Sequence, residues 1–338
     1  MPTYALLTKE SSNRVYAKGA AQLLEAELEA IAPHFSTEVT EVATTRLGGI
    51  TYVTFQTETL SEIDRFYASN LSGARALFET VDESLRPLDV TPLEYFGDDL
   101  VTIQRYQGKT NEQFTHLLVN LTTAASSSAH DRVSKGKTVG LLDPVAGRGS
   151  TLNRALMYGF DAAGIEHNSG DVDQYRQFLS TYLKSNRVKH KVTSERFRKG
   201  DLAGDSAFDV DIAKGRQHVR MVNGDARRAK RYFPGRTFDV IVGDLPYGVQ
   251  HGAKTGSALR RSPKELVQSS IESWTALLAV GGAIGLSFNT KTLPRVELAS
   301  LLSSAGLTVV DHPKPFTHQV DRAITRDLII AAAVRSAH

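Results

Sequence analysis

The pattern of apolar and polar positions changes along the chain, with a break near residue 108. In the first part, apolar runs and period-two alternation predict strands, while apolar positions at helical spacing predict helices. The predicted strands are residues 3–8, 36–46 and 50–58, and the predicted helices are residues 19–32 and 60–71. We therefore expect a small α+β domain over residues 1–82, followed by a connector over residues 83–108.

Strands and helices alternate regularly in the second part of the chain. Such alternation predicts an α/β domain over residues 109–338 with a Rossmann-like, seven-stranded, largely parallel sheet covered on both faces. The predicted strands are residues 138–143, 161–166, 218–225, 238–244, 281–288, 307–312 and 326–335. No helix separates the last two strands, so we expect one of them to run antiparallel at an edge. Residues 126–137 predict a polar loop, and residues 191–217 predict a polar insertion.

Composition narrows the class of protein. The 338 residues include no cysteine, which excludes disulfides and thiolate metal sites, and histidines and carboxylates show no metal-ligand spacing. The first residues lack the apolar core of a signal peptide, and no apolar run approaches the length of a membrane span. We therefore expect a cytoplasmic protein with neither a metal nor a membrane as partner.

Charge is distributed unevenly. The net charge is only +3, yet residues 184–264 hold 19 Lys and Arg against 8 Asp and Glu. A segregated basic block favours a polyanionic partner such as a nucleic acid, although a solvated surface can have the same composition. We predict the phosphate contacts among the cations that follow the strand ending at residue 244: Lys254, Arg260, Arg261 and Lys264.

A glycine-containing loop follows the first predicted strand of the second domain. Parallel strands end at the edge of the sheet where ligands bind, and glycines there let the backbone approach a ligand. The third glycine of a dehydrogenase fingerprint and the Lys-Ser/Thr ending of a P-loop are both missing. The loop positions that we assign to cofactor binding are Asp143, Pro144, Ala146, Gly147 and Gly149.

Acidic residues also follow the next two strands. Glu166 is placed to accept hydrogen bonds from two ribose hydroxyls, and Asp225 to accept one from an adenine amino group. Each acid alone is more typical of a turn or cap. Together with the glycine loop, they indicate an adenosine-containing cofactor that carries no triphosphate.

The fourth strand end reads Asp244-Leu245-Pro246-Tyr247. With the glycine loop and the two acids, this segment resembles the ordered motifs of class I S-adenosylmethionine-dependent methyltransferases. In detail it is similar to the Asp/Asn-Pro-Pro-Tyr motif of enzymes that methylate exocyclic amino groups. The flanking segments resemble the tRNA guanine-N2 methyltransferases over residues 105–335. The resemblance implies S-adenosylmethionine as cofactor, tRNA as substrate, and further cofactor contacts at Asn111, Thr115 and Ala226.

The resemblance assigns the chemistry to this segment. Asp244 and the carbonyl of Leu245 each accept one hydrogen of a planar amino group, which directs the nitrogen lone pair toward the methyl donor. Pro246 holds both acceptors rigid, and Tyr247 stacks on the base. Leu245 stands where the family usually has proline, but the acceptor there is a backbone carbonyl.

The N-terminal part departs from that family. Residues 1–80 resemble its ferredoxin-like domain, but the connector is too short for the RNA-capturing THUMP domain that normally follows. RNA capture then requires another element, such as a protein partner, or a different substrate. Three alternatives stay open: an N6-adenine DNA methyltransferase or a protein glutamine methyltransferase of the same mechanism, and a non-catalytic RNA-binding protein.

Overall fold

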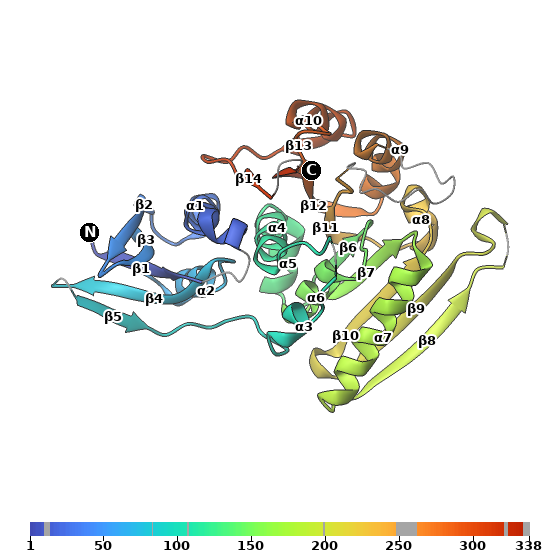
Figure 1. Cartoon of the computed structure of the whole chain (residues 1–338), viewed down its shortest axis with the longest axis horizontal. Helices are drawn as coiled ribbons and strands as arrows, with labels where there is room; N and C mark the ends of the chain where they lie inside the picture. Colours follow the sequence, from blue (N-terminus) through green and yellow to red (C-terminus); the bar gives the residue numbers. More distant parts are fainter. Residues whose placement is uncertain are drawn as a thin grey trace.

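The structure is a computed structural model that describes residues 1–9, 14–82, 84–106, 108–198, 200–247, 262–320 and 324–333. It contains two β-sheets, one formed by the first part of the chain and one by the second (Figure 1). The two are called here the N-terminal sheet and the C-terminal sheet. The α/β class predicted from the sequence is confirmed.

The N-terminal sheet is antiparallel and has the strand order β2-β3-β1-β4-β5. Two helices cover it, and the second begins at a capping box in which Ser61 and Asp64 exchange hydrogen bonds with each other's backbone. β5 pairs with β4, so this sheet extends into the segment that we expected to be a connector. The elements are β1 (Thr3–Thr8), α1 (Arg14–Ile31), β2 (Thr40–Leu47), β3 (Ile50–Gln56), α2 (Glu62–Ser69), β4 (Ala74–Val81) and β5 (Ser84–Leu88).

Three helices lead into the C-terminal sheet: α3 (Asp99–Thr102), α4 (Glu112–Ala124) and α5 (Ser127–Ser134). α5 lies where we expected a polar loop. Its N-cap is Ser126, whose side chain accepts a hydrogen bond from the amide of Ala129, and it buries Ala129 against the sheet. A single buried alanine gives too weak a pattern to predict a helix.

A buried carboxylate joins the N-terminal sheet's helices to α4. Glu27 of α1 is fully buried; it accepts hydrogen bonds from the amide and hydroxyl of Ser72, at 2.9 and 2.6 Å, and from Nδ2 of Asn120 at 2.7 Å. Tyr158 in turn donates to Asn120. Burial raises the pKa of Glu27 to about 7, against the hydrogen bonds that Ser72 and Asn120 donate.

This carboxylate gives the folding stability a defined pH dependence. Its pKa is raised on folding from 4.5 to about 7. The folded chain therefore holds the proton longer, so the free energy of unfolding falls as pH rises through this interval, by on the order of 3 kcal/mol. Glu27→Gln should flatten that fall, whereas Glu27→Leu, which leaves three buried donors unpaired, should cost about 3 kcal/mol near neutral pH.

Urea unfolding at pH 4.5 to 8 measures both effects. The exposed Glu58→Gln is the control for loss of a carboxylate as such. Asp143 titrates over the same interval, so the informative quantity is the difference between the wild type and Glu27→Gln. An unchanged pH slope in that variant would contradict the assignment.

The C-terminal sheet has ten strands, in the order β13-β15-β12-β11-β6-β7-β10-β9-β8, with β14 paired to β15. Its strands are β6 (Gly140–Asp143), β7 (Asp161–Glu166), β8 (His190–Arg196), β9 (Ser206–Ile212), β10 (Gln217–Asn223), β11 (Phe238–Asp244), β12 (Leu278–Asn289), β13 (Leu307–Val309), β14 (His318–Gln319) and β15 (Thr325–Ala333). Its further helices are α6 (Ser150–Met157), α7 (Ser169–Ser185), α8 (Ala229–Tyr232), α9 (Pro263–Thr275) and α10 (Arg295–Ser304).

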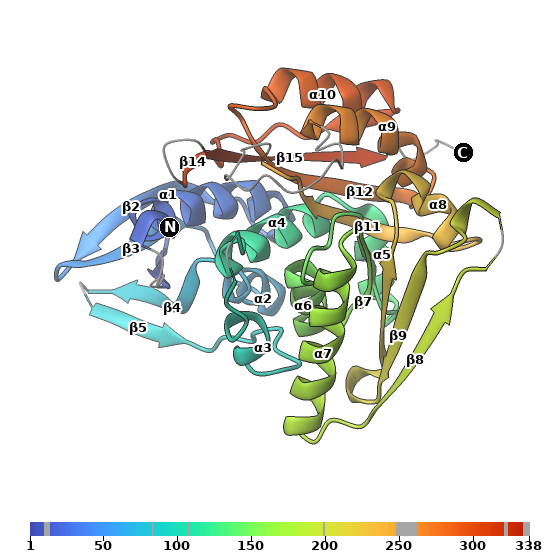
Figure 2. The ribbon, with the colours of Figure 1, turned by 45° about the vertical axis from the view of Figure 1, so that its right-hand side comes forward.

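Helices cover both faces of this sheet. α6 and α7 lie on one face, while α9 and α10 lie beside β12 and β15 on the other (Figure 2). Each face has its own apolar cluster: Leu152 and Tyr175 belong to one, Trp274 and Leu298 to the other. The strands between them are consequently apolar on both sides, as in β11, where six of the seven residues are buried.

The strand order creates a topological switch point between β6 and β11. From β6 the chain proceeds outward to β7 and β10, and from β11 it proceeds the opposite way to β12. The connections therefore separate at the carboxyl ends of β6 and β11, the place where an open sheet is expected to have a crevice. Open α/β sheets bind their ligands in such a crevice.

The predicted strand count of seven is wrong because three further strands join the sheet: the short β14, which pairs with β15, and two strands in the polar segment at 191–217. That segment is not an irregular insertion, because it forms β9 and most of β8, a hairpin that extends the sheet beyond β10. One side of the hairpin packs on α7 through Phe208 and Val210, while Asp209 on the other side is paired with His218 and Arg220. The charged positions of β9 and the mostly exposed side chains of β8, the edge strand, conceal the strand pattern.

The prediction for the last two strands is also wrong in position. β15 is the antiparallel strand, but it lies between β12 and β13 rather than at an edge. Within the described ranges, no helix is long and apolar enough to cross a membrane. The same residues contain no cluster of histidine and carboxylate side chains that would hold a metal ion.

Candidate active site

The glycine loop turns from β6 into α6 at the switch point. Gly149, with φ of +79°, precedes the first helical residue, and a Cβ atom there would lie 2.3 Å from the ring of Tyr175. Gly147 also has a positive φ, +51°, but a Cβ there would meet nothing within 4 Å. Gly149 is therefore required by packing and conformation, while Gly147 faces open space, which suits a loop that lies against a ligand.

Two of the predicted acids hold this loop in place. Asp143, at the end of β6, is buried and accepts a hydrogen bond of 2.9 Å from the amide of Val145; burial raises its pKa to about 7. Glu166, at the end of β7, accepts bonds of 3.0 Å from the amide of Gly147 and 2.7 Å from that of Asn168. Burial also raises the pKa of Glu166, against those two hydrogen bonds.

The third predicted acid, Asp225, is held by an ion pair as well as by a hydrogen bond. Its carboxylate accepts from the backbone amide of Arg227 at 3.0 Å and forms an ion pair with the guanidinium of the same residue. Burial alone would raise the pKa of Asp225, but the hydrogen bonds and charge of Arg227 outweigh burial and lower it. An adenine amino group would have to use the acceptor positions that Arg227 leaves, and Ala226 lies buried beside them.

Asp244 ends β11 directly beside the glycine loop. A Cβ on the preceding Gly243 would lie 3.1 Å from Val145, so the two strand ends are in contact. Ser287 donates to Oδ1 of Asp244 at 2.7 Å, and Tyr247 donates to Oδ2 at the same distance. Thr110, just ahead of α4, also donates to Oδ2. Hydroxyl groups from three separate elements therefore orient this carboxylate.

The residues that follow Asp244 are held by backbone contacts. Leu245 is buried, and its amide donates to the carbonyl of Ser287 at 2.9 Å. The carbonyl of Tyr247 accepts from Asn289 at 3.3 Å and from Thr292 at 3.2 Å. Leu245 therefore fills an apolar site, while Pro246 is exposed and Tyr247 half-buried.

Arg326 of β15 completes the surroundings of Asp244. Its guanidinium is buried, lies 3.9 Å from Oδ2 of Asp244, and stacks on the rings of Tyr247 at 4.8 Å and Phe114 at 5.2 Å. Burial lowers its pKa, while Asp244 opposes that effect. Within the described part of the chain, Nε of Arg326 has no hydrogen-bond partner. A buried cation that is not fully satisfied is costly, which points to a role beyond packing.

Other predicted residues fall partly within this site. Asn111 caps α4 by accepting from two amides of its first turn, and Thr115 donates to the carbonyl of Asn111, so both lie next to Thr110 at the crevice. Lys264, on α9, already forms an ion pair of 2.7 Å with Glu297. The remaining predicted phosphate contacts, Lys254, Arg260 and Arg261, lie outside the described residues.

The sequence analysis missed Thr110, Ser287 and Arg326. Hydroxyl residues are too common for Thr110 or Ser287 to be recognised without the fold. Arg326 could have been noticed in the sequence, because with Asp327 it places two charges at the start of an otherwise apolar strand. In the structure, Asp327 forms an ion pair of 3.1 Å with Arg295, whereas Arg326 lies over the crevice.

Comparison with known proteins yields folds only. No family model matches the chain, and no curated protein does either. Among solved structures, TrmN from Thermus thermophilus is 13% identical, covering 99% of this chain and 100% of its own, with a TM-score of 0.47. An rRNA methylase from Streptococcus thermophilus is 11% identical over 62% of this chain and 95% of its own, with a TM-score of 0.36.

A third similar structure acts on a small molecule by its name. It is precorrin-6y C5,15-methyltransferase from Geobacter metallireducens, 13% identical over 72% of this chain and 98% of its own, with a TM-score of 0.42. Identities and TM-scores this low do not assign a reaction to the present chain. The residues at the switch point have to carry that assignment.

Proposed function

We propose that this protein is an S-adenosylmethionine-dependent methyltransferase that acts on an exocyclic amino group of a base in RNA. The observation that carries the proposal is the position of Asp244: an oriented carboxylate at the switch point, in contact with the glycine loop and followed by a pinned Leu-Pro-Tyr segment. A turn or cap carboxylate requires neither hydroxyl donors from three elements nor a buried guanidinium beside it.

The residues at the crevice fit an adenosine cofactor. The space over Gly147 is open, and Glu166 uses one acceptor position on each oxygen for the loop amides, which leaves others for ribose hydroxyls. Asp143 shapes the loop, and Asn111 and Thr115 border the crevice from α4. When bound, S-adenosylmethionine supplies an electrophilic methyl group on a sulfonium.

Asp244 can accept a hydrogen bond from an amino group while it keeps its present hydrogen bonds. Among the described residues, Oδ1 accepts from Ser287 alone, so one acceptor position of that oxygen remains, whereas Oδ2 already accepts from Tyr247 and Thr110. The carbonyl of Leu245 is the second acceptor. Together they orient the nitrogen lone pair, and after transfer the surplus proton leaves to Asp244 or to water.

The finer assignment is guanine N2 of a tRNA. It is supported by the motifs that resemble the tRNA guanine-N2 methyltransferases and by the basic block at 184–264. In this proposal, the N-terminal part of the chain is a ferredoxin-like domain whose sheet extends through β5 to Leu88, a shorter connector follows it, and residues 109–338 are the methyltransferase domain. We further propose a cytoplasmic enzyme in which other elements of the chain or a protein partner replace the missing THUMP domain.

Two variants at Tyr247 separate the effect of ring stacking from the effect of its hydrogen bond. Tyr247→Phe removes the hydroxyl bonded to Asp244 but keeps the ring, so kcat should stay within about threefold of the wild type. Tyr247→Ala removes the stacking face, an interaction worth about 1–3 kcal/mol per base, and should lower kcat/KM by about 10-fold or more. Equal losses in the two variants would contradict a stacking role.

Methyl transfer from labelled S-adenosylmethionine tests the proposed function. Total RNA, DNA and protein from a host are offered separately, and labelled RNA is digested to nucleosides. We expect label in RNA and its recovery as N2-methylguanosine. Label in DNA adenine or in protein glutamine would mean that the substrate is DNA or protein and not RNA. No transfer to any acceptor would favour the non-catalytic alternative.

A further inference from the structure

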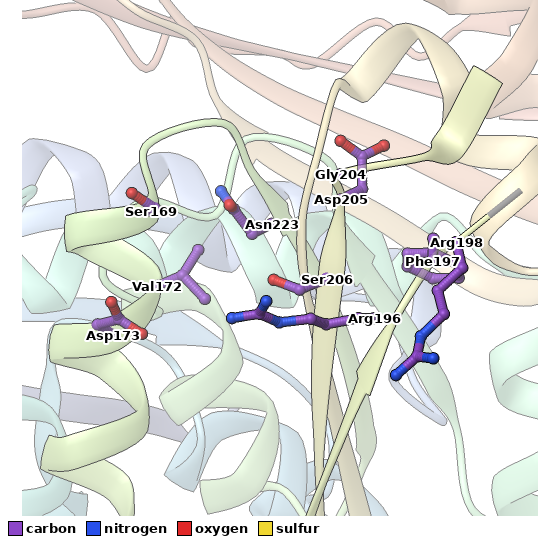
Figure 3. Close-up of a pocket in the computed structure, with 10 residues that line it drawn as sticks. All are labelled: Ser169, Val172, Asp173, Arg196, Phe197, Arg198, Gly204, Asp205, Ser206 and Asn223. Atoms are coloured by element: carbon purple, nitrogen blue, oxygen red, sulfur yellow. The ribbon is translucent and has the colours of Figure 1, made fainter.

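A second polar cavity lies at the same edge of the C-terminal sheet, away from Asp244. Its volume is about 660 Å³, within the usual range for ligand pockets. It opens between the first turn of α7 and the end of the β8–β9 hairpin (Figure 3). Its lining is mostly polar: Ser169, Asp173, Arg196, Arg198, Asp205, Ser206 and Asn223, with Val172 and Phe197.

The two arginines of this cavity are available to a ligand. Arg196 and Arg198 are both exposed, and no ion pair ties either one to another described residue. Arg196 extends from the hairpin toward Val172 of α7, whereas Arg198 points in another direction (Figure 3). Each guanidinium can therefore contact a different phosphate group, through the planar fork of its own N–H donors.

Of the two carboxylates that line the cavity, only Asp173 can offset these charges. Asp205 is already engaged, because it pairs with Arg228 at 2.9 Å and accepts from Tyr232 at 2.6 Å. Asp173 is exposed on the α7 side, and Ser169 and Asn223 offer further polar groups near it. The cavity thus has a cationic wall for phosphate and an acceptor-rich wall for sugar hydroxyls or base edges.

The position of the cavity relates it to the catalytic crevice. Arg196 ends β8, and five strand intervals separate β8 from β11, where Asp244 lies. At about 4.8 Å per interval the separation is roughly 24 Å. Along a nucleic-acid duplex that distance corresponds to about seven base pairs. A folded RNA can reach both sites at once, but a short oligonucleotide, that is a di- or trinucleotide, cannot.

We infer that this cavity binds a nucleotide of the RNA substrate at a distance from the methylated base, with its phosphates held by Arg196 and Arg198. The inference rests on the proposed function, which it deepens by naming the surface that captures folded RNA. The hairpin then supplies part of the RNA binding that the missing THUMP domain provides elsewhere.

The test compares two double variants of the full-length protein. Arg196→Ala/Arg198→Ala removes the cavity cations, and Lys189→Ala/Lys191→Ala removes the same charge from the other end of the hairpin. For a folded tRNA, we expect the arginine variant to raise Kd and KM at least about 10-fold with kcat unchanged. The slope of log K against log salt should fall by about 1.5, which corresponds to two lost phosphate contacts. The lysine variant should change these quantities much less.

A short single-stranded oligonucleotide that carries the target base provides the second arm. It should bind and react equally well with the wild type and the arginine variant. Equal losses in the arginine and lysine variants, or an equal loss with the short substrate, would overturn the inference. So would tight binding of free mononucleotides that depends on both arginines and is not displaced by tRNA.

RNA binding measured without cofactor separates this inference from the proposed function. Loss of tRNA binding in the arginine variant, in a protein that transfers no methyl group, would refute the enzyme assignment but not the binding site. Normal methyl transfer with arginine-independent tRNA binding would refute the site alone.

Discussion

Asp244→Ala should lower kcat for methyl transfer by at least about 10²-fold while leaving the affinity for S-adenosylhomocysteine within a few-fold of the wild type. Removal of one preorganised polar contact in an active site costs about this much. The carboxylate lies at the end of β11 and is oriented by Ser287, Tyr247 and Thr110, so its loss removes one of the two acceptors for the amino hydrogens.

Two further variants make this prediction specific. Asp244→Asn keeps the size and one acceptor but introduces a donor, so it should also be strongly impaired. Ser287→Ala removes only one hydrogen bond to Asp244 and should cost far less than either. Stopped-flow or steady-state transfer assays give kcat, and calorimetry gives cofactor affinity. An Asp244→Ala protein that keeps full activity would refute the mechanism, whereas one that loses cofactor binding would place Asp244 in the cofactor site instead.

Arg326→Leu should lower kcat/KM by about 10²-fold without lowering the free energy of unfolding. The guanidinium is buried between the rings of Phe114 and Tyr247 and lies 3.9 Å from Asp244, so it positions both the stacking ring and the carboxylate. Removal of one partner of a buried ion pair usually costs stability, but Asp244 is partly exposed and keeps its three hydroxyl donors. The variant also removes a buried guanidinium with an unpaired Nε, which is itself costly, and we expect this gain to offset the loss of the pair.

The conservative variant and chemical rescue distinguish positioning from packing. Arg326→Lys should not restore activity, because an ammonium does not stack between two rings as a planar guanidinium does. Added guanidinium at millimolar concentration should restore part of the activity of Arg326→Ala but none of that of Asp244→Ala. If activity falls only in proportion to a loss of folded protein, Arg326 has a structural role alone.

The fold was predictable where one pattern dominated locally. β7 and β11 are apolar segments, and their predicted limits coincide with those observed. β8 and β9 were missed because β8 is a mostly exposed edge strand, and because Glu195 of β8 and Asp209 of β9 put charges in the hairpin where they pair with Arg220 of β10. The position of β15 depends on which strand it pairs with, and this long-range choice leaves no trace in local spacing.

The residues of the candidate site also fall into those that could be predicted from the sequence and those that could not. Asp143, Glu166, Asp225 and Asp244 could be selected from sequence because each follows a predicted strand, and parallel strands end at one edge. Arg326 approaches the same crevice from an antiparallel strand more than 80 residues after Asp244. The contact therefore follows from sheet order and not from any motif. Asp225 also shows that a correct position does not fix the partner, since Arg227 holds its carboxylate.

The most direct test of the central claim is an experimental structure with S-adenosylhomocysteine and a nucleoside that carries the target amino group. The account predicts that the amino nitrogen lies within hydrogen-bonding distance of Asp244 and of the carbonyl of Leu245, with the cofactor sulfur facing it across the glycine loop. A cofactor bound away from Gly147, or a nucleoside whose amino group points away while Asp244 keeps only its present partners, would contradict it.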